Sequence, residues 1–574
     1  MPCDSQSPWE STIFRLAFGA AVLAAIAPLL ATRYLPFTDL PEHVAAMATI
    51  ARYGDFASGE AATYELAFGT SPYLVYHCLG ALLTKVTGDA VEANRLLLVV
   101  VAIAYPTSLA AALRALGRDV RLAVFGCMPL LGRALFVGFL PYLASVPLHF
   151  VGIALVATRA RRPRAWHDGA LAALAVALFY SHLSALVVFI ATAVVLDVVL
   201  SLQMSSAASP RAWALERVRR LAWLAPLSVI AALWSRSGKI TMRAESVADP
   251  TEIGRMSSFR ALYTLPLWAF DIFHSHLDEA CAVGFWLALI ALAILGLRAA
   301  AREPPHLSLG EAGPSRAGWP RALRLVARLD ACYVPLLCAG IVYVAMPFRV
   351  GAGMMLNVRL APVVILTSIL SVRGPRGRAT TIICAAAAIV TMVHSANAVV
   401  HIRKIAARYT DGFDGVLAAI RPGSKVVTLS FDAQRHETRF PPYAFAGAYH
   451  RARSGGIASY SFTEMHHWSV HYRESARPPT KGVPLWIYAP CEYRNKIDGM
   501  FYDYVLVIGE VDPFAKHPAG PRFRSIRRTA AMALYEKVEP ELNAVDGASD
   551  APCGSITMPC CTGEKSQAGG ASMP

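Results

Sequence analysis

The sequence predicts an α-helical polytopic membrane protein that ends in a small α/β domain. Of its 574 residues, 55% are hydrophobic and only 16% are charged, whereas a soluble protein carries roughly 25% charged residues. Long apolar runs recur, for example Phe14 to Thr32, Leu96 to Leu113 and Ala280 to Leu297. Each run is close to the roughly 20 residues that cross a bilayer core. The mean hydropathy of +0.43 agrees with this class.

The net charge of +15 has a topological explanation, because most of the arginines fall between apolar runs. An excess of this kind marks cytoplasmic loops, and it predicts no nucleic-acid partner. Five arginine clusters are centred on Arg118, Arg161, Arg219, Arg321 and Arg376. If all five are cytoplasmic, an even number of crossings separates each cluster from the next.

About eleven spans satisfy that condition, with the N-terminus inside and the C-terminal part outside. The first two are Phe14 to Thr32 and Leu96 to Leu113. The others are Leu122 to Gly138, Tyr142 to Thr158, two short spans within Gly169 to Leu202, Leu221 to Ser235, Ala280 to Leu297, Ala331 to Phe348, Met354 to Val372 and Ala379 to Val400. Pro72 to Thr87 is also apolar, but counting it would place the Arg118 cluster outside. We therefore predict a juxtamembrane or re-entrant helix there.

The chain divides into three parts on this basis. Residues 1–400 form the transmembrane domain, with a first outer loop at 33–93. Residues 401–541 form a small extracytoplasmic α/β domain. Its expected strands are short runs rich in Val, Ile and Tyr: Ser424 to Phe431, Pro484 to Ala489, Tyr502 to Gly509 and a final stretch within Arg524 to Val538. Residues 542–574 have the composition of a disordered tail.

The most informative motif lies directly after the first span. Asp39, Glu42 and His43 are spaced i, i+3, i+4, so a helix beginning there places them on one face. Charged residues held at a membrane surface beside many apolar helices indicate a functional site. The same spacing also fits a purely structural capping box, in which Asp39 and Glu42 bond to backbone N–H groups.

Polar residues from distant segments are predicted on the same outer face. Arg133 lies at the outer end of its span, and His182 lies at the outer turn of the short hairpin. Arg349 and Arg359 flank the last outer turn. The two arginines also fit interfacial anchors, and His182 also fits a buried residue bonding between helices. Farther along, His466, His467 and His471 fit either a metal site or a packed loop.

This arrangement resembles the GT-C glycosyltransferase superfold. The resemblance rests on a first span, an acidic outer-loop motif at Asp39 to His43, juxtamembrane helices, further spans and a terminal extracytoplasmic domain. The Asp-Leu-Pro-x-His form is similar to uncharacterised bacterial membrane proteins of this group. The superfold implies a sugar donor linked to polyprenyl phosphate and a first-loop carboxylate that acts as base or metal ligand. Asp39 matches that carboxylate, with Glu42 second. Because Leu40 and Pro41 separate the two acids, the need for a divalent metal ion stays open, and no metal ligand is assigned.

The function that the resemblance implies is transfer of a sugar from a polyprenyl-phosphate donor to a glycan, lipid or protein acceptor. The reaction belongs to the outer face of a bacterial inner membrane. Asp39, Glu42 and His43 are the expected catalytic residues, because an acceptor hydroxyl needs a carboxylate to take its proton. Arg349, Arg359, Arg133 and His182 are the expected lipid-phosphate ligands. One-step transfer inverts the anomeric centre. The alternative is a transporter or flippase of a lipid-linked sugar or another anionic lipid.

Overall fold

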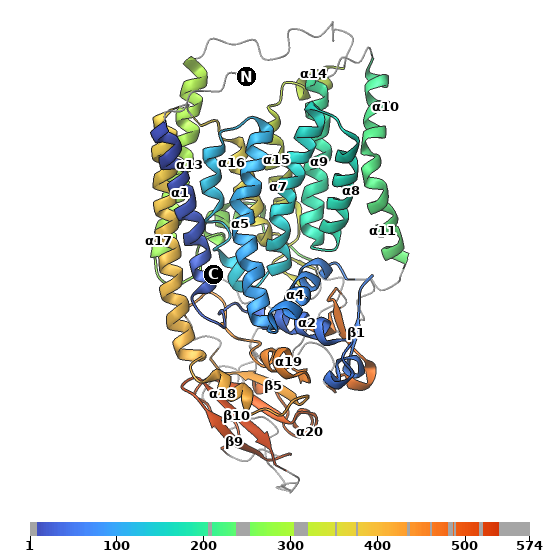
Figure 1. The fold of residues 1–574 in the computed structure, drawn as a ribbon, viewed down its shortest axis with the longest axis vertical. Coiled ribbons are helices and arrows are strands. Elements are labelled where there is room, and N and C mark those ends of the chain that lie inside the picture. Colours follow the sequence, from blue (N-terminus) through green and yellow to red (C-terminus); the bar gives the residue numbers. More distant parts are fainter. Residues whose placement is uncertain are drawn as a thin grey trace.

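The computed structural model describes residues 8–69, 71–204, 209–236, 253–302, 320–350, 353–374, 377–432, 437–459, 462–465, 467–479, 486, 490–515 and 520–538. A helical bundle forms one end of the elongated molecule, and a mixed β-sheet forms the other end (Figure 1). Among these residues, six helices are long and apolar enough to cross a membrane. They are α1 (Pro8–Ile26), α5 (Ala90–Leu116), α7 (Leu140–Arg161), α9 (Leu183–Met204), α13 (Leu277–Arg302) and α17 (Arg378–Tyr409). The predicted helical membrane fold is therefore confirmed.

Shorter helices complete the bundle. They are α8 (Ala165–Phe179), α10 (Pro210–Arg220), α11 (Ala225–Arg236), α12 (Ser258–Trp268), α14 (Arg321–Val326), α15 (Val334–Ala345) and α16 (Ala361–Ser371). The structure places a turn between α8 and α9 at His182, where the sequence predicts the outer turn of a short hairpin. The total number of crossings stays a prediction.

Local sequence explains where these helices begin and end. The side chain of Asp89 caps α5 by accepting hydrogen bonds from the N–H groups of Val91 (2.7 Å) and Glu92 (3.4 Å). The helix ends at Gly117, whose φ of 74° is the left-handed conformation that glycine adopts without strain. Apolar residues that face away from the bundle remain exposed, as expected for helices that contact lipid.

The segment from Leu122 to Gly138, predicted as a span, is not a continuous helix. This segment consists of a 3₁₀ helix (Val120–Gly126), irregular backbone and a five-residue helix, α6 (Arg133–Val137). Every residue from Arg121 to Gly138 is buried in protein. Non-helical backbone is tolerated at membrane depth only when protein, and not lipid, surrounds it. Hydropathy alone therefore cannot distinguish this segment from a helix.

The first outer loop lies between the bundle and the sheet (Figure 1). It contains α2 (Leu40–Arg52), α3 (Glu60–Thr63), β1 (Tyr64–Leu66) and α4 (Leu74–Thr87). The last of these matches the predicted juxtamembrane segment. Strand β1 pairs antiparallel with β7 (Val470–Tyr472), which comes from the C-terminal part of the chain. The first outer loop is thus joined to a segment about 400 residues later.

A five-stranded sheet follows the last long helix, in the order β6-β5-β8-β10-β9. Its strands are β5 (Lys425–Ser430), β6 (Ile457–Ala458), β8 (Tyr504–Ile508), β9 (Phe523–Arg528) and β10 (Met532–Lys537), with helices α18 (Phe413–Ala418), α19 (Ala448–Ser454) and α20 (Asp498–Phe501). Strands β5, β6 and β8 are parallel, while β8, β10 and β9 pair antiparallel. All of β8 is buried, which is typical of a strand covered on both faces. Its residues contribute alternately to the main core and to a second core around Trp486.

Three of the expected strand regions contain β5, β8 and the β9–β10 pair. The fourth, Pro484 to Ala489, lies mostly outside the described residues, as do the predicted tail and His466. Helix α17 continues without a break through residue 400, where the predicted domain boundary lies. A third small sheet, β2 (Ile253–Gly254), β3 (Arg349–Val350) and β4 (Gly353–Met354), precedes the segment that carries Arg359.

Candidate functional site

Asp39 lies at the start of α2, and backbone hydrogen bonds fix it against α6. The N–H of Thr38 donates to the carbonyl of Phe136 (2.9 Å), and the N–H of Asp39 donates to that of Val137 (3.0 Å). Gly138 follows with a φ of 101° and packs against the Asp39 backbone. No side chain other than hydrogen fits there. The buried irregular segment therefore positions the acidic loop.

The carboxylate of Asp39 is not used as a helix cap. Asp39 occupies the N-cap position, yet its side chain accepts no hydrogen bond from the first turn of α2. The capping box that its spacing to Glu42 allows is therefore absent. Asp39 also keeps part of its surface accessible, whereas Glu42 and His43 are buried. A carboxylate that makes no structural hydrogen bond and remains partly accessible is suited to act on a ligand.

Burial raises the pKa of Asp39 to about 8, with a smaller contribution in the same direction from the negative charge of Glu42. The positive charge of Arg359 opposes the shift. Asp39 and Arg359, separated by 320 positions in the numbering, are therefore close enough to interact electrostatically. A carboxylate whose pKa lies near neutral pH suits general-base chemistry.

The guanidinium of Arg359 is buried and held by main-chain carbonyls. Its Nη2 donates to the carbonyl of Met354 (2.7 Å), and its Nε donates to that of Met355 (3.2 Å). It stacks over the ring of Phe139 at 4.3 Å. Met355 has a φ of 60°, a strained conformation for a residue with a side chain. This strain accompanies a backbone path that directs two carbonyls toward Arg359.

No described carboxylate lies within ion-pair distance of Arg359, although the side chain is only 8% exposed. A buried cation without a counter-charge is costly, since desolvation is not offset by an ion pair. Its charge therefore favours an anionic ligand. Guanidinium groups bind phosphate oxygens through paired N–H donors, which matches the predicted ligand class.

His182 and Tyr73 lie next to Arg359. The Nε2 atom of His182 is 3.2 Å from the hydroxyl of Tyr73 and 3.3 Å from Nη1 of Arg359. The N–H of Ser184 donates to Nδ1 of His182 (3.2 Å), which assigns the hydrogen of the neutral ring to Nε2. Burial and the charge of Arg359 hold the pKa of His182 well below its usual value. The sequence-based interpretation includes His182 but misses Tyr73, because an aromatic residue in an apolar stretch carries no distinctive signal.

Glu42 is fully buried and turned toward the C-terminal part of the chain. Its Oε2 accepts a hydrogen bond from the N–H of Phe462 (3.3 Å) and lies 3.8 Å from Nη1 of Arg451. Arg451, on α19, is itself completely buried and stacks over the ring of Tyr64 at 4.4 Å. Glu42 thus belongs to a buried ion pair that fixes α2 to α19. This contact favours a positioning role over a direct catalytic one.

His43 is part of a buried hydrogen-bond chain. Its Nε2 donates to the carbonyl of Gly138 (3.0 Å), so its Nδ1 accepts from Nε2 of His77 (2.9 Å). Nδ1 of His77 in turn accepts from the hydroxyl of Ser469 (2.7 Å). Burial lowers the pKa of His43 to about 3, although the Gly138 carbonyl opposes the shift. Both ring nitrogens contact protein atoms, so His43 is placed to orient the acidic loop.

The other two predicted arginines occupy different surroundings. Arg133 is buried, donates from Nε to the carbonyl of Asp271 (2.5 Å) and pairs with its carboxylate. Its charge is therefore already compensated. Arg349 is half-buried in β3, opposite Gly254 and Met354, on the hairpin that precedes Arg359. The structure brings Asp39, His182 and Arg359 together, and it gives Arg133 a separate partner.

A divalent cation does not fit the donors at this site. Such ions take several oxygen ligands, often from more than one carboxylate. Here Asp39 is the one partly accessible carboxylate of the motif, it has a guanidinium beside it, and Glu42 is engaged with Arg451. In the described part of the chain, no group of three or more His, Cys, Asp or Glu side chains has a metal-binding arrangement. His467 instead packs against the ring of Tyr73, with ring centroids 5.0 Å apart.

Comparison with known proteins identifies the fold. No model of a known protein family matches the sequence, and no curated protein sequence matches it. The structure is similar to that of ArnT from Cupriavidus metallidurans bound to undecaprenyl phosphate, with a TM-score of 0.53 and 12% identity, over 92% of this chain and 98% of ArnT. The apo structure of the same protein gives a TM-score of 0.51 at 12% identity and the same coverage. ArnT has the GT-C architecture, so the predicted GT-C fold is confirmed.

Proposed function

We propose that this chain is an integral-membrane glycosyltransferase that moves a sugar from a polyprenyl-phosphate donor to an envelope acceptor. The observation that carries the proposal is the buried guanidinium of Arg359, which has no described carboxylate partner and lies beside the partly accessible carboxylate of Asp39. An anion site next to a base is what this reaction requires. The shared fold supports the proposal, because the ArnT structure holds undecaprenyl phosphate.

The chemistry assigns different tasks to the two residues. Asp39, in its ionised form, takes the proton of an acceptor hydroxyl, and the oxygen attacks the anomeric carbon of the donor sugar. The bond from that carbon to the phosphate oxygen breaks as the new bond forms, so the anomeric configuration is inverted. The departing lipid phosphate carries the bonding electrons, and Arg359 stabilises the added negative charge. Asp39 ends the step protonated.

Tyr73, which is itself held by His182, would hold Arg359 in position for this step. The hydroxyl of Tyr73 accepts from Nε2 of His182 and also bonds Arg359. Its own hydrogen then remains available to a phosphate oxygen. Fixed donors aimed at a developing charge need no reorganisation during the reaction. Tyr73 is therefore a further candidate ligand of the lipid phosphate.

The proposed location is the outer face of the bacterial inner membrane, with about eleven crossings and residues 401–541 in the extracytoplasmic space. The arginine clusters support this orientation, because they predict that Asp39 lies on the outer side. Cys491, in the C-terminal part, is disulfide-bonded. Disulfides persist in oxidising compartments, and this supports the same placement.

A transporter or flippase is the competing function, since it could use the same arginine to hold a lipid phosphate. The fold match favours transfer, because two solved structures of similar fold are those of ArnT, one of them bound to undecaprenyl phosphate. Asp39 also has no evident task in a flippase that only needs to bind an anion.

The test uses the full-length protein in proteoliposomes with a radiolabelled undecaprenyl-phosphate sugar and an acceptor extract. We expect Asp39→Asn to lower the rate of transfer strongly while still binding undecaprenyl phosphate, and Arg359→Gln to weaken that binding. The matched control is Asp411→Asn, which changes an exposed carboxylate between α17 and α18. Transfer by Asp39→Asn at the wild-type rate would falsify the base assignment. Movement of labelled lipid between leaflets without transfer would instead support the flippase.

A further inference from the structure

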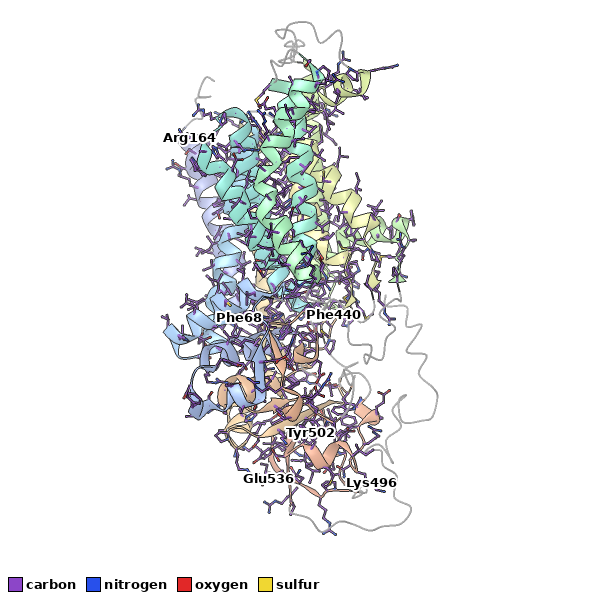
Figure 2. All side chains as sticks on the ribbon, turned by 90° about the vertical axis from the view of Figure 1, so that its right-hand side faces the viewer. Phe68, Arg164, Phe440, Lys496, Tyr502 and Glu536 are labelled. Carbon is purple, nitrogen blue, oxygen red and sulfur yellow. The ribbon has the colours of Figure 1, made fainter. Side chains whose placement is uncertain are left out.

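A second candidate site lies at the opposite end of the helical bundle from Asp39. Figure 2 shows Arg164 at this end, far from Phe440 and from Tyr502, which lies between α20 and β8. A cavity of about 240 Å³ opens there between the ends of α7, α8 and α10. It is lined by Arg159, Pro163, Arg164, Ala165, Asp168 and Arg220. Three of the six lining residues are arginines, and nothing in the proposed transfer reaction uses them.

Two carboxylates, the buried Asp197 and the exposed Asp168, hold the wall of this cavity in place. Arg159 is only 3% exposed and contacts Asp168 (2.6 Å) and Asp197 (3.4 Å). Asp197, which lies within α9, also contacts Arg217 at 3.3 Å. This network accounts for a carboxylate in an otherwise apolar helix, because buried charges are stabilised only when they are paired. It also keeps Arg159 fixed at the wall of the cavity.

The mouth of the cavity has one guanidinium and one helix end that the protein does not compensate, whereas Arg220 also pairs with Glu216 (2.8 Å). No described carboxylate lies within ion-pair distance of Arg164, and the residue is exposed. The N–H groups of Ala165 and Trp166, in the first turn of α8, have no hydrogen-bond acceptor among the described residues. The first N–H groups of a helix form a favourable site for an anion, especially beside a guanidinium.

The position of the cavity indicates the source of the anion. Trp166 is 55% exposed at the same helix end. Exposed tryptophans are enriched at the level of lipid headgroups, where the ring contacts the apolar boundary. The arginine clusters predict that this end faces the cytoplasm, where anionic lipids carry phosphate at the surface.

We infer that this cavity binds the phosphate group of an anionic phospholipid headgroup, held by Arg164, Arg220 and the N-terminus of α8. The inference is independent of the proposed transferase activity. The arginine clusters centred on Arg161 and Arg219 would then share a ligand, in addition to their role in orienting the protein in the membrane. The lipid would join α7, α8 and α10 at their cytoplasmic ends.

The test compares full-length protein in nanodiscs of phosphatidylcholine with and without phosphatidylglycerol, with native mass spectrometry as the readout of retained lipid. We expect Arg164→Gln to weaken phosphatidylglycerol retention about fivefold, which is about 1 kcal/mol at 25 °C. Arg164→Lys keeps a charge and should retain most of the binding. Arg162→Gln is the matched control, because Arg162 is exposed nearby but does not line the cavity.

Two further measurements keep the outcome decisive. The melting temperature in phosphatidylcholine alone should be equal for wild type and Arg164→Gln, which shows that the variant is folded. Equal retention of phosphatidylglycerol by these two proteins, or an equal loss in Arg162→Gln, would overturn the inference. Inorganic phosphate added to the phosphatidylcholine discs separates the two sources of phosphate. If inorganic phosphate alone raises the melting temperature as much as phosphatidylglycerol does, the ligand is a soluble phosphate and the lipid assignment is wrong.

Discussion

A β-carbon added to Gly138 would lie 2.7 Å from the Cβ atom of Asp39. The two residues come from different segments of the chain. Their backbones approach so closely that only a glycine, which has no side chain, fits at position 138. Gly138 also accepts the hydrogen bond of His43, so one residue holds two members of the acidic motif. The position of the proposed base is therefore set by a glycine about 100 residues away in sequence.

The first prediction concerns this contact. Gly138→Ala should displace Asp39 and lower transfer strongly, because neither the close approach nor a φ of 101° tolerates a side chain. The free energy of unfolding should fall by about 1–3 kcal/mol, as for other overpacked sites. The transfer assay measures the loss of activity, and denaturation measures the fall in the free energy of unfolding. Gly340→Ala, with no atom within 4 Å of the added carbon, is the control and should retain activity.

The second prediction concerns the pH dependence of the reaction. Because burial raises the pKa of Asp39 to about 8, kcat/KM should increase with pH up to that value as the carboxylate ionises. Asp39→Asn should lower the rate by about 10²–10⁴-fold, the usual contribution of a general base. A rate that is independent of pH from 6 to about 9 would argue against Asp39 as the group that titrates.

The same carboxyl should make the protein less stable as the pH rises, whereas it makes the reaction faster. Between the ordinary aspartate pKa of 3.8, which applies to the unfolded chain, and the raised value of about 8, the folded protein binds a proton that the unfolded chain releases. The free energy of unfolding contributed by Asp39 therefore falls as the pH rises across this window. Asp39→Asn should remove this fall, measured by denaturation in detergent at several pH values. A profile that is the same in wild type and variant would contradict the raised pKa.

The third prediction separates charge from geometry at Arg359. Arg359→Lys retains a positive charge but loses the planar pair of donors that bind two phosphate oxygens. We expect both Arg359→Lys and Arg359→Gln to reduce kcat by about 10²–10³-fold, the usual effect of removing a donor to a developing charge. Arg219→Gln, on the exposed side of α10, is the control. Full activity in Arg359→Lys would mean that charge alone suffices.

The fourth prediction distinguishes positioning from catalysis at Glu42. Glu42→Gln removes the buried negative charge that faces Arg451, so the free energy of unfolding should fall by about 3–5 kcal/mol. The double variant Glu42→Gln/Arg451→Gln should lose less than the sum of the single variants, as expected for coupled residues. Glu65→Gln, which changes an exposed side chain in β1, is the control. A Glu42→Gln protein with normal stability but no transfer would support a direct catalytic role instead.

The sequence predicts which membrane face carries the site, but not which residues meet there. Arginine clusters indicate which ends of the spans face the cytoplasm, so Asp39, His182 and Arg359 are predicted on the same, outer side. These three residues lie close together in the structure. The same reasoning includes Arg133, whose lateral neighbour is Asp271. Lateral neighbours depend on helix packing, which the positive-inside rule does not address.

Other features of the site have no sequence signal of their own. Tyr73 contacts His182 only because α4 packs beside the α8–α9 turn, and the apolar pattern of α4 does not reveal this. The segment from Leu122 to Gly138 has the hydropathy of a span, because buried irregular backbone and a lipid-facing helix select the same apolar residues. The motif at Asp39 satisfies a capping box equally well by spacing, and only the geometry of the side chain excludes it.

The pairing of β1 with β7 has a consequence for biosynthesis. Residues 64–66 leave the ribosome early, but their partners at 470–472 follow only after every predicted span has been made. The chain from Ser469 to His43, and the pair of Glu42 with Arg451, are equally long-range. Contacts between distant positions form late, since their loops must close first. The acidic loop should therefore reach its working shape only after the C-terminal part has been translocated, and a nascent or truncated chain would be inserted but inactive.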